Sequence, residues 1–146
     1  MEKTLIAGRN GGVPSKTDET CAAELMTRAF LAVAPEDTLG EVAEKMTAAD
    51  AGSALVTEFG QLSGILTSRD ILRAIGARVH PSEGRVRDWM TADPVTAAPD
   101  LPAEEAAHAM LTGGFHHLPV VEDERPLGVV GLRAAAGFTR TPVPGF

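Results

Sequence analysis

The sequence predicts an α+β fold made of two similar units, each with the order strand, helix, strand, strand, helix. The main observation is an internal repeat with constant spacing. Positions 26–27 and 90–91 both read Met-Thr, and Pro99 follows Pro35 by 64 positions (99 − 35) without a gap. The same spacing relates Met46 to Met110, Gly64 to Gly128 and Arg69 to Arg133. Each copy, at roughly 50 residues, is too short to bury much surface alone, so we expect the copies to pack on each other.

The first half of each copy combines a short apolar strand with a helix. The strands are expected within 30–34 (FLAVA) and 94–98 (PVTAA). In the first copy, Thr38 and Glu41 have the spacing of a capping box. Apolar residues then recur at i, i+3, i+4 and i+7 on one face of a helix; they are Leu39, Val42, Ala43 and Met46. In the second copy the helix covers 103–112 and ends at two glycines.

The second half of each copy predicts a hairpin followed by a helix. The strands and turns are 53–57 (SALVT), 58–61 (EFGQ) and 62–67 (LSGILT) in the first copy, and 117–121 (HLPVV), 122–126 (EDERP) and 127–131 (LGVVG) in the second. The last helix of the first copy contains Ile71, Leu72 and Ile75, and Gly76 is expected at its C′ position.

Composition narrows the range of functions. The chain has 146 residues, of which 44% are hydrophobic and 23% charged, as is usual for globular proteins. Its net charge of −7 argues against a nucleic-acid partner. No apolar run is long enough to span a membrane. A single cysteine, Cys21, excludes an internal disulfide and fits a reducing, cytoplasmic location. We interpret Cys21 as chemically inert.

The two ends of the chain differ from the repeat. The start is rich in Gly, Ser, Thr and Lys and lacks the apolar region of a signal peptide, so we expect it to be flexible. The end, TRTPVPGF, contains two prolines and is not expected to be helical. The expected organisation is a flexible N-terminal segment 1–20, a first unit 21–76, a linker 77–87, a second unit 88–138 and a C-terminal tail 139–146.

The ordered motifs DWMTADPVTAAPD, HHLPVV and GILTSRD, placed in this tandem arrangement, resemble a stand-alone pair of cystathionine-β-synthase (CBS) domains over residues 22–138. No single motif is specific, but the ordered set occurs twice at constant spacing. The resemblance implies two CBS units packed through their sheets as one pseudo-twofold module. It also implies a cleft for AMP, ADP, ATP, S-adenosylmethionine or NAD, a homodimer, and regulation of a partner protein.

The ribose and phosphate motif of that family is glycine, two aliphatic residues, Thr or Ser, two variable residues and Asp. The first copy has this motif complete, from Gly64 to Asp70. A carboxylate can accept hydrogen bonds from both vicinal hydroxyls of a ribose. The N-terminus of a helix offers free N–H groups to a phosphate, and the intervening residues add two hydroxyls and a cation.

Thr67 and Asp70 fit a second interpretation equally well, because they also have the spacing of a capping box. In the second copy Gly131 and Ala134 replace them, so the fold does not strictly require this cap. That difference favours a ligand site, although the alanine-rich second helix needs less help at its start. Both interpretations stay open at this stage. We predict at most one competent nucleotide site, centred on Asp70.

The resemblance implies that the second unit completes this site. Val95 would line the adenine pocket, and His116 and His117 would lie near the base or the phosphates. Where many relatives carry an arginine, this chain has two histidines, whose charge depends on pH; this favours AMP or a nucleoside over triphosphates. The candidate ligand-binding residues are Gly64, Ile65, Leu66, Thr67, Ser68, Arg69, Asp70, Val95, His116 and His117.

Three other features allow simpler interpretations. His116 and His117, with His108 and Asp123 nearby, suggest a metal, but adjacent strand residues point to opposite faces and cannot easily share an ion. Trp89 is interpreted as a hydrophobic plug where the linker re-enters the module, or as a partner contact. Pro119 indicates an edge strand or the start of a strand.

The sequence favours an adenine-nucleotide-binding regulatory module that needs no resident cofactor. It is expected to be a cytoplasmic homodimer that acts on an unknown protein partner, with neither nucleic acid nor membrane involved. An enzyme is not expected, because the sequence lacks a nucleophile beside a base, a P-loop and a CxxC motif. The alternative is a ligand-free CBS scaffold used for dimerisation.

Overall fold

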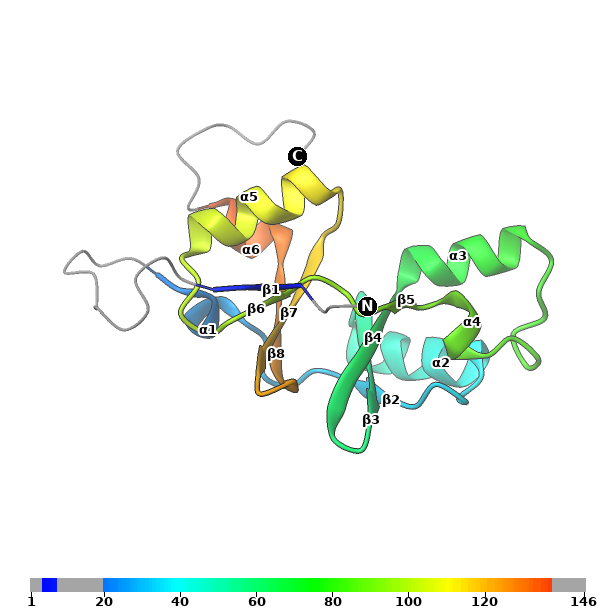
Figure 1. Ribbon diagram of the computed structural model, residues 1–146. Helices are drawn as coiled ribbons and strands as arrows, with labels where there is room; N and C mark the ends of the chain where they lie inside the picture. Colours follow the sequence, from blue (N-terminus) through cyan, green and yellow to red (C-terminus); the bar gives the residue numbers. More distant parts are fainter. Residues whose placement is uncertain (1–3, 8–19, 138–146) are drawn as a thin grey trace.

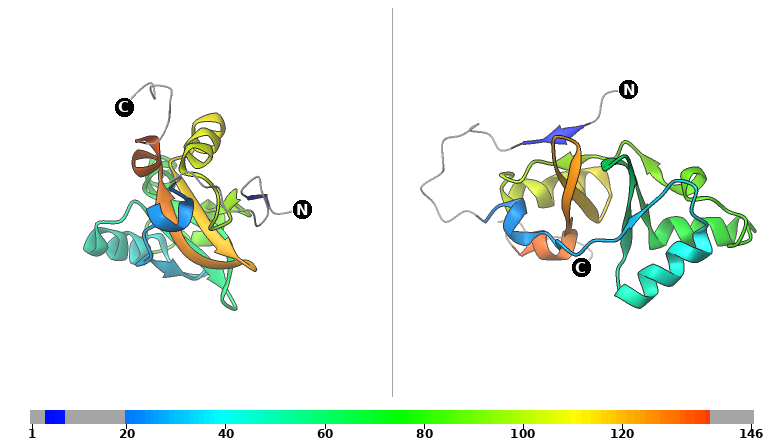
Figure 2. Two further views of the ribbon diagram at one scale, coloured as in Figure 1. Left: turned by 90° about the vertical axis from the view of Figure 1, so that its left-hand side faces the viewer. Right: turned by 90° about the horizontal axis from the view of Figure 1, so that it is seen from below.

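The computed structural model describes residues 4–7 and 20–137, which form two four-stranded sheets and six helices (Figure 1, Figure 2). In chain order the elements are β1 (Leu5–Ile6), α1 (Ala22–Leu25), β2 (Ala32–Val33), α2 (Leu39–Ala49), β3 (Ser53–Glu58), β4 (Gln61–Thr67), α3 (Ser68–Gly76), α4 (Val86–Trp89), β5 (Thr91–Ala92), β6 (Thr96–Ala97), α5 (Ala103–Gly113), β7 (His117–Glu122), β8 (Arg125–Gly131) and α6 (Leu132–Ala136).

Three strands of each sheet come from one copy of the repeat, which confirms the predicted fold class, and the fourth strand, β5 in the first sheet and β1 in the second, comes from outside that copy. The first sheet has the order β2-β3-β4-β5, and the second has the order β1-β6-β7-β8. In the first sheet β2 pairs in parallel with β3, and in the second β6 pairs in parallel with β7. The hairpin strands β3–β4 and β7–β8 are antiparallel. The sequence β2-α2-β3-β4-α3 is therefore repeated as β6-α5-β7-β8-α6. No helix within the described residues is long and apolar enough to cross a bilayer.

The two units meet through their sheets. A buried cluster between the hairpins draws residues from both halves of the chain; its members are Leu55, Leu62, Ile65, Val121 and Val129. The amide of Leu62 also donates a hydrogen bond of 2.9 Å to the carbonyl of Glu124 in the other hairpin. The hairpins β3–β4 and β7–β8 accordingly lie side by side at the centre of the molecule (Figure 1). Each unit has its own second core, between its sheet and its helices.

The predicted start of α2 and end of α5 are confirmed. The hydroxyl of Thr38 accepts the N–H of Glu41 at 3.1 Å, and the Glu41 carboxylate accepts the N–H of Thr38 at 3.2 Å. This reciprocal pair satisfies two amides that have no partner inside the helix. On the predicted apolar face, Leu39, Val42 and Met46 are buried. The helix α5 ends at Gly114, whose φ of 72° is the left-handed conformation that glycine adopts without strain.

The short helices α1 and α4 are exchanged between the units. Ala22 of α1, at the start of the first copy, is buried in the core of the second unit. Val86 of α4, at the corresponding position of the repeat, is buried in the core of the first unit. Each short helix therefore completes the core of the other copy. Sequence periodicity did not indicate this exchange, because four residues are too few to define a face.

The N-terminal segment is not entirely flexible, which corrects the prediction for residues 4–7. Here β1 pairs in parallel with β6, and the amide of Thr96 donates to the carbonyl of Thr4 at 2.8 Å. The equivalent edge of the first unit is closed differently, since the Asp37 carboxylate accepts the N–H of Ala34 at 2.9 Å. The second unit has Leu101 at that position of the repeat, so the N–H of Ala98 bonds to β1 instead. Residues 1–3 and 8–19 of the N-terminal segment lie outside the described residues, and so does the tail 139–146.

Gly76 is not the C′ residue, which corrects a second prediction. The helix α3 includes Gly76, and Arg78 adopts the left-handed conformation with φ of 68°. The N–H of Arg78 bonds to the carbonyl of Ile75, and the N–H of Val79 bonds to that of Ala74, both at 3.0 Å. This is a Schellman motif. Val79 packs against the core that contains Ala74, and this contact sets the end of the helix.

Pro119 does not lie at an edge or at a strand start, which corrects a third prediction. It is the third residue of β7, which lies between β6 and β8, and it is fully buried. Its partner Val129 directs both backbone hydrogen bonds away from β7, to Thr27. The imide nitrogen of Pro119 therefore faces the β6 side. On that side the proline cannot donate the hydrogen bond that the N–H of Leu55 donates to the carbonyl of Leu31 at the equivalent position of the first unit. The hydrogen bonds between β7 and β8 are unaffected.

Candidate functional site

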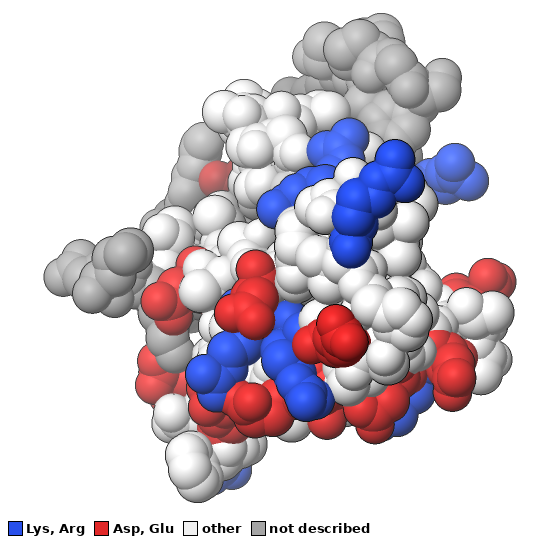
Figure 3. All heavy atoms as spheres, turned by 90° about the vertical axis from the view of Figure 1, so that its right-hand side faces the viewer, with Lys and Arg blue, Asp and Glu red and all other residues white. Residues whose placement is uncertain are grey.

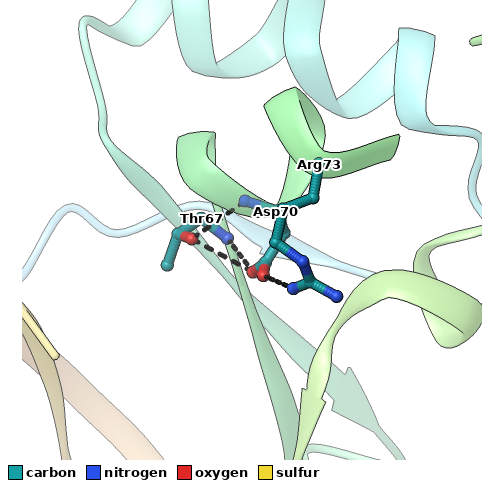
Figure 4. Close-up of polar contacts among 3 residues, drawn as sticks. All are labelled: Thr67, Asp70 and Arg73. Atoms are coloured by element: carbon teal, nitrogen blue, oxygen red, sulfur yellow. Dashed lines mark hydrogen bonds and ion pairs between the residues drawn. The ribbon is translucent and has the colours of Figure 1, made fainter. Parts of the chain in front are cut away.

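The predicted motif lies at the junction of β4 and α3, where Thr67 and Asp70 cap the helix. One carboxylate oxygen of Asp70, Oδ2, accepts hydrogen bonds from the N–H of Thr67 at 2.8 Å and from its hydroxyl at 3.1 Å (Figure 4). In return, the hydroxyl of Thr67 accepts the N–H of Asp70 at 3.4 Å. Asp70 is only 6% exposed, so this carboxylate is one of the few buried polar groups among the described residues.

The second oxygen of Asp70 is bound by a residue that the sequence analysis did not select. Arg73 Nη1 lies 2.8 Å from Asp70 Oδ1, one helical turn further along α3 (Figure 4). The Arg73 guanidinium also lies over the ring of Trp89, 5.6 Å from its centroid. The i, i+3 spacing of Asp70 and Arg73 could have indicated this ion pair. The contact with Trp89 of α4 could not be read from the sequence.

The other residues of the motif divide into two groups. Gly64, Ile65 and Leu66 are buried within β4. Gly64 is explained by packing, because a Cβ atom there would lie 2.6 Å from the sulfur of Met90 and 2.9 Å from the carbonyl oxygen of Thr91. Ser68 and Arg69, the first residues of α3, are exposed. The solvent-accessible end of the motif is therefore the start of the helix.

The second copy of the motif lacks this arrangement. Its helix α6 begins at Leu132 after Gly131, without a side-chain cap. The helix forms nevertheless, so a cap is not needed to start it. It is, however, five residues long where the capped α3 has nine. The comparison thus supports a stabilising role for Thr67 and Asp70 and leaves room for a second role.

His117 connects the second unit to this junction. The N–H of Ser68 donates to the carbonyl of Gly52 at 3.1 Å, which fixes the start of α3 against the loop before β3. A Cβ atom on Gly52 would lie 3.1 Å from Cε1 of His117, so the imidazole rests against that loop. Burial, together with the neighbouring His116, lowers the pKa of His117. The ring is therefore predominantly neutral at pH 7.

The remaining candidates lie further apart. His116 is exposed, and its carbonyl accepts the N–H of Leu132 at 2.8 Å, as Gly52 does for Ser68 in the first unit. Val95 is half-buried just before β6 and packs against the core of the second unit. Trp89 packs against the core of the first unit, as expected of a hydrophobic plug. The described residues contain no group of three or more metal-binding side chains.

Charge is unevenly distributed at the end of the molecule formed by the first unit. Figure 3 shows mainly Lys and Arg side chains on the upper part of this face, whereas the lower part carries Asp and Glu side chains with further Lys and Arg among them. The helix α3 and the turn after it contribute three exposed arginines, Arg69, Arg73 and Arg78. Despite the net charge of −7, the surroundings of the candidate site are therefore locally basic, which suits an anionic ligand.

A sequence model of the CBS domain matches residues 22–77 and 86–137. The chain belongs to the CBS domain family. The CBS domain-containing protein YhcV of Bacillus subtilis is 30% identical over 109 residues, which cover 75% of this chain and 78% of that protein. CBSCBSPB1 of Arabidopsis thaliana is 42% identical over 95 residues, covering 64% of this chain. This chain spans only 18% of the length of CBSCBSPB1 and 22% of that of a matching inosine-5'-monophosphate dehydrogenase from Methanocaldococcus jannaschii.

Solved structures agree with the fold. The CBS-domain protein ATU1752 from Agrobacterium tumefaciens superposes with a TM-score of 0.74 at 26% identity, covering 81% of this chain and 98% of that one. The CBS domain pair of protein MJ0100, solved with 5-methylthioadenosine and S-adenosyl-L-methionine, has a TM-score of 0.72 at 24% identity and covers 80% and 92%. Both matches are to CBS-domain proteins, and they show that this chain has the fold of a CBS domain pair.

Proposed function

We propose that this chain is a regulatory module that binds an adenosine-containing ligand at the junction of β4 and α3. The observation that carries the proposal is the buried Asp70 carboxylate beside Thr67, present in the first copy and replaced by Ala134 and Gly131 in the second. The ligands bound by the CBS pair of MJ0100 support this class of compound. The locally basic surface of α3 supports an anionic group at one end of the ligand.

Each residue has a distinct role in this proposal. Asp70 accepts the ribose hydroxyls, and Thr67 with the exposed first turn of α3, at Ser68 and Arg69, binds phosphate. Val95 contacts the adenine. His116 and His117 lie near the base or phosphate from the second unit. The buried residues of the motif, Gly64, Ile65 and Leu66, set the position of the strand that carries Thr67.

The favoured ligand is AMP rather than a triphosphate. A triphosphate needs several fixed cations, whereas the second unit offers two histidines, one of them with a lowered pKa. Neutral imidazoles contribute hydrogen bonds but little charge. We further propose that the protein is a cytoplasmic homodimer, in which the ligand shifts the packing of the two sheets and thereby alters a protein partner. Such a shift requires that the ligand bind one arrangement more tightly than the other.

A ligand-free scaffold is the second candidate, and one observation favours it. Thr67 and Arg73 together bond both oxygens of Asp70, so the carboxylate is satisfied as a helix cap without any ligand. In this alternative the module serves to bring two chains together.

A thermal denaturation series separates the two candidates. AMP, ADP, ATP, S-adenosylmethionine, NAD and adenosine would be added to wild type, Asp70→Ala and Thr38→Ala. The last variant removes the matched capping box of α2, away from the site. A ligand at a hundred times its Kd stabilises the fold by about 2.7 kcal/mol. The regulatory proposal expects this effect in wild type and Thr38→Ala only. An absence of stabilisation in all three proteins would favour the scaffold.

A further inference from the structure

Asp70 is occupied on both sides by groups of its own chain. Thr67 bonds Oδ2 through its N–H and its hydroxyl, and Arg73 bonds Oδ1 at 2.8 Å. With these partners in place the side chain of Asp70 is only 8% exposed, whereas that of Arg73 is 58% exposed. The buried acceptor is therefore covered on the Oδ1 side by an arginine that can swing into solvent.

Trp89 provides the surface on which Arg73 rests. The guanidinium lies 5.6 Å from the centroid of the Trp89 ring, at a distance where the cation and the ring attract each other. Trp89 belongs to α4, which is one of the two exchanged helices and leads directly into β5. Trp89 also packs against the core of the first unit. Arg73 thus joins the carboxylate of α3 to the helix that leads into the second unit.

We propose that Arg73 is an internal competitor of the ribose for Asp70, and that it sets the affinity of the site. The inference rests on the proposed function, since it concerns the same carboxylate. Because the side chain of Asp70 is only 8% exposed, we expect a ribose hydroxyl to reach Oδ1 only when Nη1 of Arg73 moves aside. Binding therefore costs the ion pair, and the arginine is released from Asp70 whenever the ligand is held.

The release of Arg73 from Asp70 also links ligand binding to the position of α4. Once Arg73 leaves Oδ1, the ion pair no longer fixes its position over Trp89, and α3 and α4 lose one of their links. The chain after α4 runs through β5 to Val95, which the proposal places at the adenine. Occupation of Asp70 and the position of α4 are therefore coupled through a single side chain.

Isothermal titration with adenosine tests the competition, since a nucleoside without phosphate gains nothing from the positive charge of Arg73. The variant is Arg73→Gln. The matched control is Arg133→Gln, which removes the same charge from an exposed residue of α6, outside the proposed ligand site. An ion pair with one exposed partner corresponds to at most about a fivefold change in Kd. We expect adenosine to bind Arg73→Gln more tightly than wild type, by up to about fivefold, with Arg133→Gln unchanged.

The fluorescence of Trp89, the only tryptophan of the chain, provides an independent measurement. Adenosine is expected to change the emission of wild type and Arg133→Gln, because the guanidinium of Arg73 leaves the ring. In Arg73→Gln the ring has already lost this neighbour, so adenosine should bind without the change. Arg73→Lys keeps the charge without the planar group, and should bind adenosine more tightly than wild type by a smaller factor. It replaces the glutamine variant if that variant does not fold.

The outcomes separate this inference from the proposed function. Equal or weaker binding of adenosine to Arg73→Gln and Arg73→Lys, compared with wild type, would overturn the competition and leave the ligand site intact. A lack of adenosine and AMP binding in wild type and in both Arg73 variants would overturn the proposed function, and this inference with it.

Discussion

Substituting Gly64 by alanine tests the close contact between β4 and β5. The added Cβ would lie 2.6 Å from the sulfur of Met90 and 2.9 Å from the carbonyl oxygen of Thr91. The sulfur ends a flexible side chain and can rotate away. The carbonyl cannot, because Thr91 pairs with Ile65 and the N–H of Asp93 bonds to the carbonyl of Ser63 at 3.1 Å. The substitution must therefore move β5 away from β4.

Overpacking of this kind costs about 1–3 kcal/mol, and the fixed carbonyl places Gly64→Ala near the middle, at about 2 kcal/mol. For a chain of this size that is a fall in Tm of about 8 °C. Urea unfolding, followed by the fluorescence of Trp89, would measure it. Gly128→Ala should cost a similar amount, since its Cβ would meet the sulfur of Met26 at 2.7 Å and the carbonyl of Thr27 at 2.8 Å.

Gly131→Ala is the matched control, because nothing lies within 4 Å of a Cβ atom there and its φ of −85° suits any residue. It should stay within about 0.5 kcal/mol of wild type. If Gly64→Ala were as stable as Gly131→Ala, the packing explanation for this glycine would be wrong, and a role in ligand binding would be the better one.

Three further predictions concern α3, its end and the neighbouring histidine. Arg78→Gly should raise the free energy of unfolding by about 1 kcal/mol, because Arg78 has a φ of 68° that glycine adopts without strain; urea unfolding without any gain would contradict the Schellman assignment. Thr67→Ala should cost about 1 kcal/mol and lower the helical signal in circular dichroism, as Thr38→Ala should for α2; an unchanged stability would show that the cap contributes nothing. For His117 the folded state favours the neutral ring, since burial lowers its pKa. The unfolded chain then binds the proton more readily, so stability is complete above the unfolded pKa of about 6.5 and falls as pH decreases from there toward the folded pKa. His117→Gln should flatten this part of a plot of unfolding free energy against pH, and an equal slope in both proteins would refute the assignment.

The sequence was sufficient for the repeated core of the fold because the repeat has a constant spacing and each longer element has a clear period. The capping box of Thr38 and Glu41 and the apolar face of α2 are local patterns, and both were found as expected. The pairing of β1 with β6 is different. In the first unit the carboxylate of Asp37 accepts the N–H of Ala34. The second unit has Leu101 at the equivalent position, so the N–H of Ala98 is free to bond to the carbonyl of Ile6 in β1.

The candidate site could be located from the sequence, but its chemistry could not be read completely. Thr67 and Asp70 were selected by their motif, and their mutual hydrogen bonds follow from the spacing. Arg73 was missed although it lies one turn away. Its position over Trp89 depends on the return of α4 to the first unit, which a linear pattern does not contain. Pro119 was misplaced for a similar reason, because the direction of its nitrogen depends on how Val129 is paired.

The exchange of α1 and α4 gives the chain the geometry of a domain-swapped dimer whose two copies have been fused. Ala22 fills the core of the later half and Val86 that of the earlier half, so neither half contains all of its own interior. If the backbone were cut within 77–85, each fragment would retain a helix that its partner fragment needs. The two fragments are therefore expected to reassociate in preference to folding separately. The same interlocking limits how far the halves can move apart in the intact chain, so any signal passed between them must be a small rotation rather than a wide opening.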